Sequence, residues 1–246
     1  MSVKKSNSVL ELIKTVAWAI IIAMTVRTTA YEPFNIPSGS MIPTLLVGDY
    51  LFVSKFSFGY SRYSLPLSVP LISDRIFFSE PKRGDVVVFR KPTDTSIDYI
   101  KRLIGMPGDK IQMVEGVLHI NGKTIERKRI KGLQQVDPFG RKFAVPQFLE
   151  TLPNGRKYNI LEVMGDKGDA DNTGIFSVPR GHYFMMGDNR DNSVDSRDSS
   201  VGMVPARNLV GRAEVIFWAW DSRWSWWEIW NWYRAIRFNR VFGNIK

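Results

Sequence analysis

The segment DYIKRLIG, Asp98 to Gly105, decides the kind of fold this chain adopts. Successive side chains of an extended strand point to opposite faces, so Lys101 and Arg102 have different surroundings in a strand. If Lys101 points inward, its amine is removed from water. An edge strand with both charges at its surface also fits the pattern. The segment therefore predicts a β-sheet and leaves open whether Lys101 is buried.

The chain around this segment keeps the strand character. Short runs rich in Val, Ile and aromatic residues alternate with Gly, Pro and Asp, as in GDVVVFR (84–90), KIQMVEGVLHINGK (110–123) and GRAEVIFWAW (211–220). Asn121 and Gly122 lie between apolar alternations and predict a hairpin turn. Residues 45–215 contain no long amphipathic pattern. We therefore predict a mainly β fold, with the more charged residues 112–180 as an inserted β subdomain.

The N-terminal segment predicts a transmembrane helix. Residues 12–30 are mostly apolar, with an uninterrupted core, VAWAIIIAMTV, at 16–26. A bilayer needs about 20 apolar residues, so this core alone is short. Lys14 and Arg27 can extend their charges to opposite interfaces, which makes the whole of 12–30 a candidate span.

The basic residues around this segment predict its orientation. Lys4, Lys5 and Lys14 outweigh Arg27, so the positive-inside rule places the N-terminus in the cytoplasm and the rest of the chain on the other side. A cleaved secretory signal ending at Ala30 is the alternative. The charge of Arg27, just before that cut, favours an uncleaved anchor.

The C-terminal stretch 218–246 has a composition of its own. It holds seven of the eight tryptophans, and Arg234, Arg237 and Arg240 follow them within the same stretch. Polar Glu228 and Asn231 recur with Arg234 at helical spacing, which predicts an amphipathic segment. Indole and guanidinium groups favour the membrane interface and anionic headgroups. Packing on the chain's own domain or on a partner is the alternative.

The net charge of +10 is compatible with several partners. The densest basic run is ERKRIKG, 126–132, and a solvated strand or loop explains it. No nucleic-acid-binding motif accompanies this run, so we expect no nucleic acid partner. Anionic membrane lipid is the partner that suits an anchored, basic chain.

The residue inventory limits the chemistry. The chain has no cysteine and two histidines, and neither His119 nor His182 lies in a metal-binding motif, so we expect no metal site. There is no GxSxG motif for a Ser-His-Asp triad, and Pro81 opposes the helix that the SxxK spacing of 79–82 requires. A lysine can also activate a serine, if burial lowers its pKa enough to leave the amine neutral. Lys101 is the candidate.

Four motifs, in order after the apolar segment, carry a family resemblance. They are IPSGSMIPTL (36–45), RGDVVVF (83–89), YIKRLIGMPGD (99–109) and GDNRDNSVDSR (187–197). With them the chain closely resembles the bacterial type I signal peptidases over roughly residues 10–217. The resemblance implies a signal-peptidase/repressor-peptidase-like β fold and a Ser-Lys endopeptidase without a cofactor. The implied substrates are preproteins carrying signal peptides.

The resemblance also implies a location and a set of domains. The location is the bacterial cytoplasmic (inner) membrane, with a single span and the catalytic domain on the outer, periplasmic side. The expected domains are an N-terminus and anchor (1–30), a catalytic β domain (31–111 with 181–217), an inserted β subdomain (112–180) and a Trp/Arg-rich interfacial tail (218–246).

The resemblance assigns roles to individual residues. Ser40 is the expected nucleophile and Lys101 the expected general base. The Ser38 hydroxyl and the Ser40 backbone N–H are the expected oxyanion donors. Ser193 is expected to orient the Lys101 amine. The remaining expected roles are loop bracing by an Asp195–Arg197 ion pair, and pockets for small side chains at Ala-x-Ala-like sites formed by Phe34, Ile36, Pro37, Met41, Leu45 and Ile100.

Two other functions remain compatible with the sequence. One is a self-cleaving Ser-Lys protein of the repressor-peptidase type, which the membrane segment and the absence of a DNA-binding helical domain disfavour. The other is a non-catalytic, membrane-anchored β module that binds a partner, in which Ser40 is dispensable.

Overall fold

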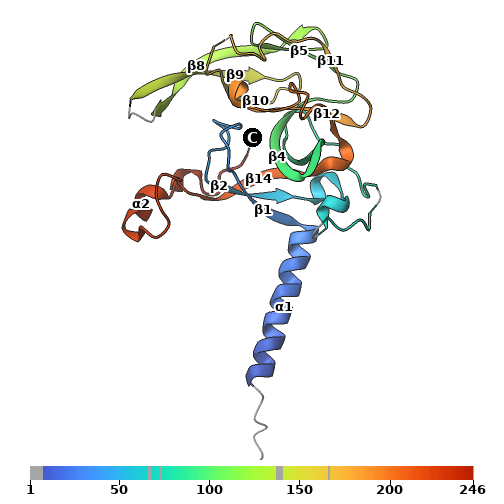
Figure 1. The fold of residues 1–246 in the computed structure, drawn as a ribbon, viewed down its shortest axis with the longest axis vertical. Helices are drawn as coiled ribbons and strands as arrows, with labels where there is room; N and C mark the ends of the chain where they lie inside the picture. Colours follow the sequence, from blue (N-terminus) through green and yellow to red (C-terminus); the bar gives the residue numbers. More distant parts are fainter. Residues whose placement is uncertain (1–7, 66–67, 73, 137–140, 166, 246) are drawn as a thin grey trace, which may run out of the picture.

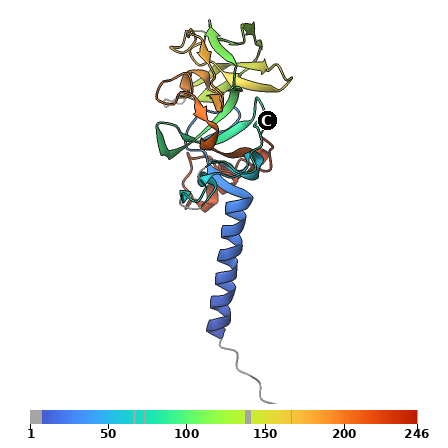
Figure 2. The same ribbon diagram turned by 90° about the vertical axis from the view of Figure 1, so that its right-hand side faces the viewer.

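A long helix projects from a β body in the computed structural model, which describes residues 8–65, 68–72, 74–136, 141–165 and 167–245. Perpendicular views show helix α1 (Ser8–Thr29) leaving the strands without packing along them (Figures 1 and 2). Its segment Val9–Thr29 has a mean hydropathy of 2.0 and no buried share. The helix therefore fits a membrane anchor. Lys4 and Lys5, used above for orientation, lie outside the described residues.

The body is built on a seven-stranded antiparallel sheet. Its order is β1-β2-β14-β3-β4-β12-β13. The strands are β1 (Tyr31–Asn35), β2 (Asp49–Ser54), β3 (Val86–Lys91), β4 (Asp94–Gly105), β12 (His182–Met186), β13 (Val204–Pro205) and β14 (Leu209–Ala219). Strand β4 lies between β3 and β12, so the edge-strand interpretation of Lys101 is wrong. The strand carrying this lysine is interior.

The seven-stranded sheet buries side chains on both of its faces. In β3, Val86 and Val88 join one core cluster, whereas Val87 and Phe89 join another that also contains Leu103 of β4. Because both faces of β3 are buried, its segment VVVF is continuously apolar and does not alternate between apolar and polar residues.

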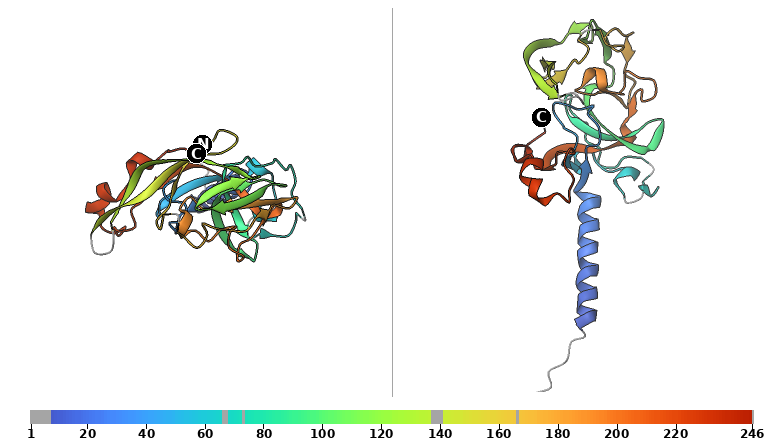
Figure 3. Two further views of the ribbon diagram at one scale, coloured as in Figure 1. Left: turned by 90° about the horizontal axis from the view of Figure 1, so that it is seen from above. Right: turned by 60° about the vertical axis from the view of Figure 1, so that its left-hand side comes forward.

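Two smaller sheets form the end of the body opposite α1 (Figures 1 and 3). Their orders are β10-β9-β8 and β11-β5-β6-β7. The strands are β5 (Lys110–Val114), β6 (Val117–Ile120), β7 (Lys123–Thr124), β8 (Glu126–Val136), β9 (Lys142–Thr151), β10 (Lys157–Leu161) and β11 (Phe176–Ser177). They span residues 110–177, so the expected subdomain boundary at 112 falls inside β5.

The predicted hairpin turn is present between β6 and β7. Ile120 pairs with Lys123, and the two residues between them, Asn121 and Gly122, have φ of 54° and 74°. Both residues adopt the left-handed conformation that a two-residue hairpin loop of this kind requires.

Short helical turns connect the strands and form the tail. They are η1 (Phe56–Phe58), η2 (Arg62–Ser64), η4 (Arg190–Asn192), η5 (Ala206–Asn208), η6 (Ile229–Asn231), α2 (Trp232–Ala235) and η7 (Phe238–Arg240). The helical spacing in the tail therefore yields only η6 and α2, not an extended amphipathic helix.

The tail is attached to its own domain while exposing its indoles. Arg240 binds Asp49 of β2 at 2.5 Å, and Ile245 packs on the core beneath the main sheet. Trp226, Trp227 and Trp230 remain 62–73% exposed. One side of the tail thus packs on the protein, and the other presents aromatic surface.

Candidate active site

The loop between β1 and β2 carries Ser40, which lies just above the hydrophobic core. Asn189, from the loop after β12, holds this loop from two sides. Its side-chain amide donates to the Gly39 carbonyl at 3.0 Å, and its backbone N–H donates to the Ser40 carbonyl at 3.1 Å. Met41, fully buried just after Ser40, anchors the loop from below. The Ser40 side chain thus extends from a backbone fixed at two carbonyls.

Strand β4 brings Lys101 to Ser40. The Lys101 Nζ lies 2.6 Å from the Ser40 Oγ, and the two residues are 4% and 8% exposed. Burial lowers the pKa of Lys101 from 10.5 to about 8, although the charges of Asp195 and Asp188 oppose this shift. At pH 7 roughly a tenth of the amine is therefore neutral, and a neutral amine can accept the serine proton.

Two hydrogen-bond donors lie beside the Ser40 hydroxyl. The Ser38 Oγ is 3.5 Å from the Ser40 Oγ. The Ser40 backbone N–H makes no hydrogen bond within the described part of the chain. A hydroxyl and an unpaired N–H next to a nucleophile have the geometry to stabilise an oxyanion.

A cavity of about 520 Å³ opens at these residues. Of the predicted pocket residues, Phe34, Ile36, Pro37 and Ile100 line it together with Ser38, Ser40 and Lys101. Met41 and Leu45 do not line it. Both are 0% exposed and belong to the core cluster under the loop, because the turn at Ser40 directs them inward.

Several cavity residues were missed in the sequence. Tyr99 lines the cavity and places its ring centroid 5.2 Å from the Lys101 Nζ. Strand alternation puts Tyr99 on the face of Lys101, so the signal was present. Asp98, Asn192 and Val194 also line the cavity. The last two flank Ser193 within a motif whose loop conformation the sequence does not reveal.

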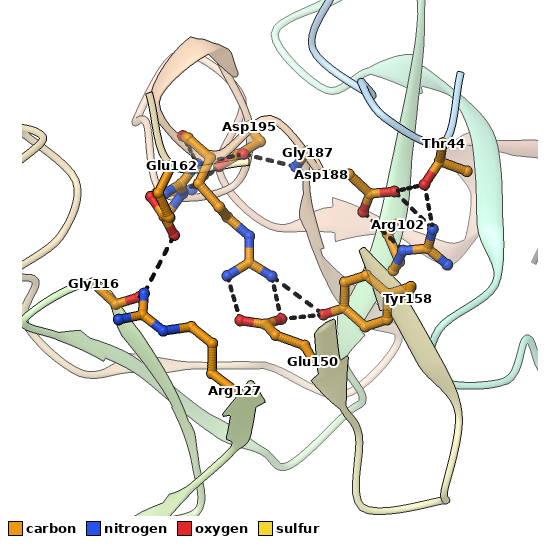
Figure 4. Close-up of polar contacts among 12 residues, drawn as sticks. Thr44, Arg102, Gly116, Arg127, Glu150, Tyr158, Glu162, Gly187, Asp188 and Asp195 are labelled. Carbon is orange, nitrogen blue, oxygen red and sulfur yellow. Dashed lines mark hydrogen bonds and ion pairs between the residues drawn. The ribbon is translucent and has the colours of Figure 1, made fainter. Parts of the chain in front are cut away.

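The loop after β12 contains the predicted ion pair. Arg197 Nε and Nη2 each lie 2.9 Å from an oxygen of Asp195, which also accepts the Gly187 N–H at 2.9 Å (Figure 4). Arg197 donates further to the Arg190 carbonyl at 2.6 Å. Although burial opposes it, the charge and hydrogen bonds of Arg197 lower the pKa of Asp195. This carboxylate therefore stays ionised and braces the loop.

The predicted hydrogen bond from Ser193 to Lys101 is absent. The Ser193 hydroxyl is buried and makes no hydrogen bond of ordinary geometry to another described residue, although it lies close enough to Asp195 to help lower the pKa of that carboxyl. It packs against Gly187, where an added Cβ would lie 2.5 Å from the Ser193 Cβ and 2.6 Å from the Ser40 carbonyl oxygen. Ser193 is therefore a neighbour of the Ser40 loop, but the Lys101 amine bonds to Ser40 instead.

The opposite face of β4 carries a second buried cation. Arg102 donates to both oxygens of Asp188, at 2.8 and 2.7 Å, and to the Gly84 carbonyl at 2.8 Å (Figure 4). Thr44, from the loop of Ser40, donates to the same Asp188 at 2.5 Å. This network ties the Ser40 loop to β4 and to the loop of Asn189.

The histidines take no part in the site. His119 in β6 contacts Thr124 at 2.9 Å, and His182 in β12 contacts the Arg180 carbonyl. Neither histidine is among the residues that line the cavity at Ser40.

Comparison with known proteins gives the chain its family. The model of the family described as "Signal peptidase, peptidase S26" matches residues 9–218. The chain belongs to this family of signal peptidases. Signal peptidase I of Rickettsia conorii is 43% identical over 93% of this chain and 90% of its own length. That of Rickettsia typhi is 41% identical over 98% and 96%, respectively.

A solved signal peptidase I from Enterococcus faecalis is 24% identical, with a TM-score of 0.31, and the match covers 55% of this chain and 97% of that chain. The family, predicted from the four motifs, is confirmed. Members are serine endopeptidases that remove signal peptides from preproteins. The apolar helix α1 fits a membrane-anchored signal peptidase.

Proposed function

We propose that this signal peptidase cuts preproteins at Ala-x-Ala-like sites with Ser40 as nucleophile and Lys101 as general base. The observation that carries the proposal is the 2.6 Å contact between the Ser40 hydroxyl and an amine that is 4% exposed. The contact joins two residues 61 positions apart, and the pKa of about 8 gives the amine the proton affinity that a base needs near neutral pH.

In the acylation step, the Ser40 Oγ attacks the carbonyl carbon of the residue before the cut, and the hydroxyl proton passes to the Lys101 Nζ. The carbonyl oxygen becomes an oxyanion that accepts hydrogen bonds from the Ser38 hydroxyl and the Ser40 N–H. Each donor of this kind commonly contributes about 3 to 4 kcal/mol to transition-state stabilisation. The Lys101 ammonium then protonates the departing amine as the peptide bond breaks.

In the deacylation step, a water molecule attacks the ester carbonyl of the acyl-enzyme. Lys101, neutral again after the amine leaves, takes the proton from this water. Collapse of the second oxyanion returns the proton from Lys101 to the Ser40 oxygen and releases the signal peptide. One buried amine thus acts as base and as acid in both halves of the reaction.

The cavity supports the proposed choice of substrate. Phe34 and Ile36 at the end of β1 face Ile100 of β4 across the cavity, and a substrate in extended form fits between these two strands. The apolar walls next to Ser40 accept small side chains, whereas a larger one would clash, as Ala-x-Ala specificity requires.

The anchor and the tail support a site of action at a membrane. We propose that α1 crosses the inner membrane once, with its N-terminus in the cytoplasm and the β body on the outer side. In Figures 1 and 2 the tail lies at the end of the body from which α1 leaves. Exposed Trp226, Trp227 and Trp230, with Arg223 77% exposed beside them, suit an interface of anionic lipid. Nucleic acid is not an expected partner.

Cleavage of a preprotein tests the proposed function. The full chain in detergent is given a preprotein with an Ala-x-Ala site, and mass spectrometry locates the cut. We expect cutting directly after the signal peptide, lost in Ser40→Ala and in Lys101→Ala. Full cleavage by a folded Ser40→Ala variant would overturn the assignment, and a folded wild type that cuts no preprotein would favour the binding-module alternative.

A further inference from the structure

Three acidic side chains meet outside the active site. Glu162, Asp171 and Asp191 each offer a carboxylate oxygen, and these oxygens all lie within 4.8 Å of one another. Glu162 directly follows β10, Asp171 lies in the connection to β11, and Asp191 lies in η4. Carboxylates this close repel one another when ionised, so the group needs a proton or a cation.

Glu162 supplies an observation independent of this clustering. It is 0% exposed, and neither of its carboxylate oxygens has a hydrogen-bond partner among the described residues. Its ion pair is long: the Arg127 Nη1, which donates to the Gly116 carbonyl at 2.9 Å, lies 3.7 Å from the Glu162 Oε1 (Figure 4). A buried carboxylate without hydrogen bonds is costly and rare. It therefore points to a ligand.

The surroundings of Glu162 leave its charge undercompensated. Glu162 is fully buried beside the carboxylates of Asp171 and Asp191, and the Arg190 guanidinium lies nearby. Arg190 itself pairs with Glu150, to which its Nη1 donates at 2.8 Å. The nearby guanidinium is thus already bound to another carboxylate.

The two aspartates are held in fixed orientations. Asp191 accepts the Met164 N–H at 2.7 Å, and Asp171 accepts the Gly168 N–H at 2.6 Å. Gly168 lies so close that an added Cβ would be 3.1 Å from an Asp171 oxygen and would also collide with Asp191. The backbone N–H groups of Met164 and Gly168 thus hold the two carboxylates, while Asp191 remains partly exposed and gives an ion access from solvent.

We propose that Glu162, Asp171 and Asp191 bind a calcium ion. Carboxylate oxygens are the ligands that hard divalent cations prefer. Ca²⁺, with oxygen distances of about 2.3 to 2.6 Å, allows two ligands to be up to about 4.6 to 5.2 Å apart, whereas Mg²⁺ at about 2.1 Å allows only about 4.2 Å. Oxygen separations within 4.8 Å can be spanned by one Ca²⁺ ion, which also accepts irregular ligand geometry, whereas Mg²⁺ demands near-ideal octahedral geometry.

The position of this site gives the ion a structural consequence. It joins the end of β10 and the connection to β11 with η4. The residues that follow Asp191 are Asn192, which lines the catalytic cavity, and Ser193, which packs beside Gly187. Calcium therefore stabilises the loop that forms one wall of the cavity, without touching Ser40 or Lys101.

Calcium titration of the full chain in detergent, after removal of divalent ions with a chelator, tests the proposal. CaCl₂ is added in a calorimeter, and the unfolding temperature is recorded in parallel. We expect binding heat and, at about 100 times Kd, an upward shift of roughly 5 to 10 °C. MgCl₂ should give a smaller shift.

Matched variants locate the binding. Glu162→Gln and Asp171→Asn should abolish the calcium-dependent shift. Asp169→Asn removes the same charge from an exposed position of the same loop and should leave the shift intact. Glu162→Gln should fold, because the amide replaces a buried charge with a neutral group.

Two outcomes would overturn the proposal. One is a wild type with neither binding heat nor a calcium-dependent shift, which would mean that a proton alone neutralises Glu162. The other is an equal calcium shift in wild type and all three variants, which would place the ion elsewhere. Both readouts measure binding directly and do not depend on peptidase activity.

Discussion

Lys101 and Arg102 are adjacent on β4, and both are almost completely removed from water, with 4% and 0% exposure. On its face, Lys101 meets a hydroxyl, and burial lowers its pKa to about 8. On the other face, Arg102 meets the carboxylate of Asp188. Although burial opposes it, the charge and hydrogen bonds of Asp188 raise the pKa of Arg102. The same strand thus holds one cation that can lose its charge and one that cannot.

The difference shows how burial can serve either reactivity or structure. A lysine without a carboxylate in contact responds to burial by becoming neutral, which produces a base. A guanidinium stays protonated under all ordinary conditions, so it is tolerated inside only when fully paired. Substitutions on the Lys101 face should therefore mainly lower activity, whereas breaking the ion pair on the Arg102 face should mainly lower stability.

The largest expected effect comes from placing a guanidinium on the Lys101 face. Lys101→Arg should lower kcat/KM by about 10⁴-fold, because a permanently protonated group cannot accept the serine proton. Preprotein cleavage measures the loss, and circular dichroism checks the fold. Lys110→Arg, at an exposed lysine of β5, is the control and should be fully active. Retained turnover in Lys101→Arg would remove Lys101 as the base.

The next effect comes from breaking the pair on the Arg102 face. Asp188→Asn leaves a buried guanidinium without its countercharge and should lower the free energy of unfolding by about 3 to 5 kcal/mol. Denaturant unfolding measures this change. Asp169→Asn at an exposed site should change stability by less than about 0.5 kcal/mol. A small loss in Asp188→Asn would mean that the Arg102 pair is dispensable for the fold.

A smaller effect should follow from disturbing the geometry of the Lys101 face without changing a charge. In Gly187→Ala, the new Cβ would lie 2.6 Å from the Ser40 carbonyl oxygen, so the Ser40 loop must shift. Because a misplacement of about 1 Å can cost about 100-fold, kcat should fall by that order. Gly174→Ala, where no atom lies within 4 Å of the added Cβ, is the matched control. Unchanged kcat in Gly187→Ala would show that the loop has room to adjust.

The smallest effect on stability should appear when the Lys101 charge is removed. Lys101→Met should be inactive, yet as stable as wild type within about 1 kcal/mol or more stable, because no carboxylate loses its partner. In wild type, a protonated Lys101 amine in the core lowers the free energy of unfolding at pH values below 8. Any stability that Lys101→Met gains over wild type should therefore be full below pH 8 and should shrink between pH 8 and 10.5, the ordinary lysine pKa. Denaturant unfolding across this range checks the trend. A strongly destabilised Lys101→Met would make Lys101 a structural cation like Arg102.

Local patterns in the sequence predicted the features that depend on neighbouring residues. Alternation along β4 separated Lys101 from Arg102, and Asn121-Gly122 predicted the turn between β6 and β7, because strand geometry and φ preferences are local. The same alternation puts Tyr99 on the face of Lys101, although Tyr99 was not predicted to line the cavity.

Contacts between distant segments were not predictable from one sequence. Asp188 lies 86 residues after Arg102, and nothing in either segment indicates the pairing. Met41 and Leu45 follow Ser40 closely, yet the turn directs them into the core rather than the cavity. The position of the Ser193 hydroxyl likewise depends on the conformation of its loop, which tertiary packing determines.

The pH dependence of kcat/KM tests most directly whether Lys101 is a buried amine that acts as a base. In the free enzyme this parameter reports the ionisation of the essential base. We predict that kcat/KM rises about tenfold per pH unit at acidic and neutral pH and levels off near pH 8, the pKa of Lys101. A rate independent of pH from about 6 to 9, or a midpoint at about 6.5 where histidine titrates, would contradict it.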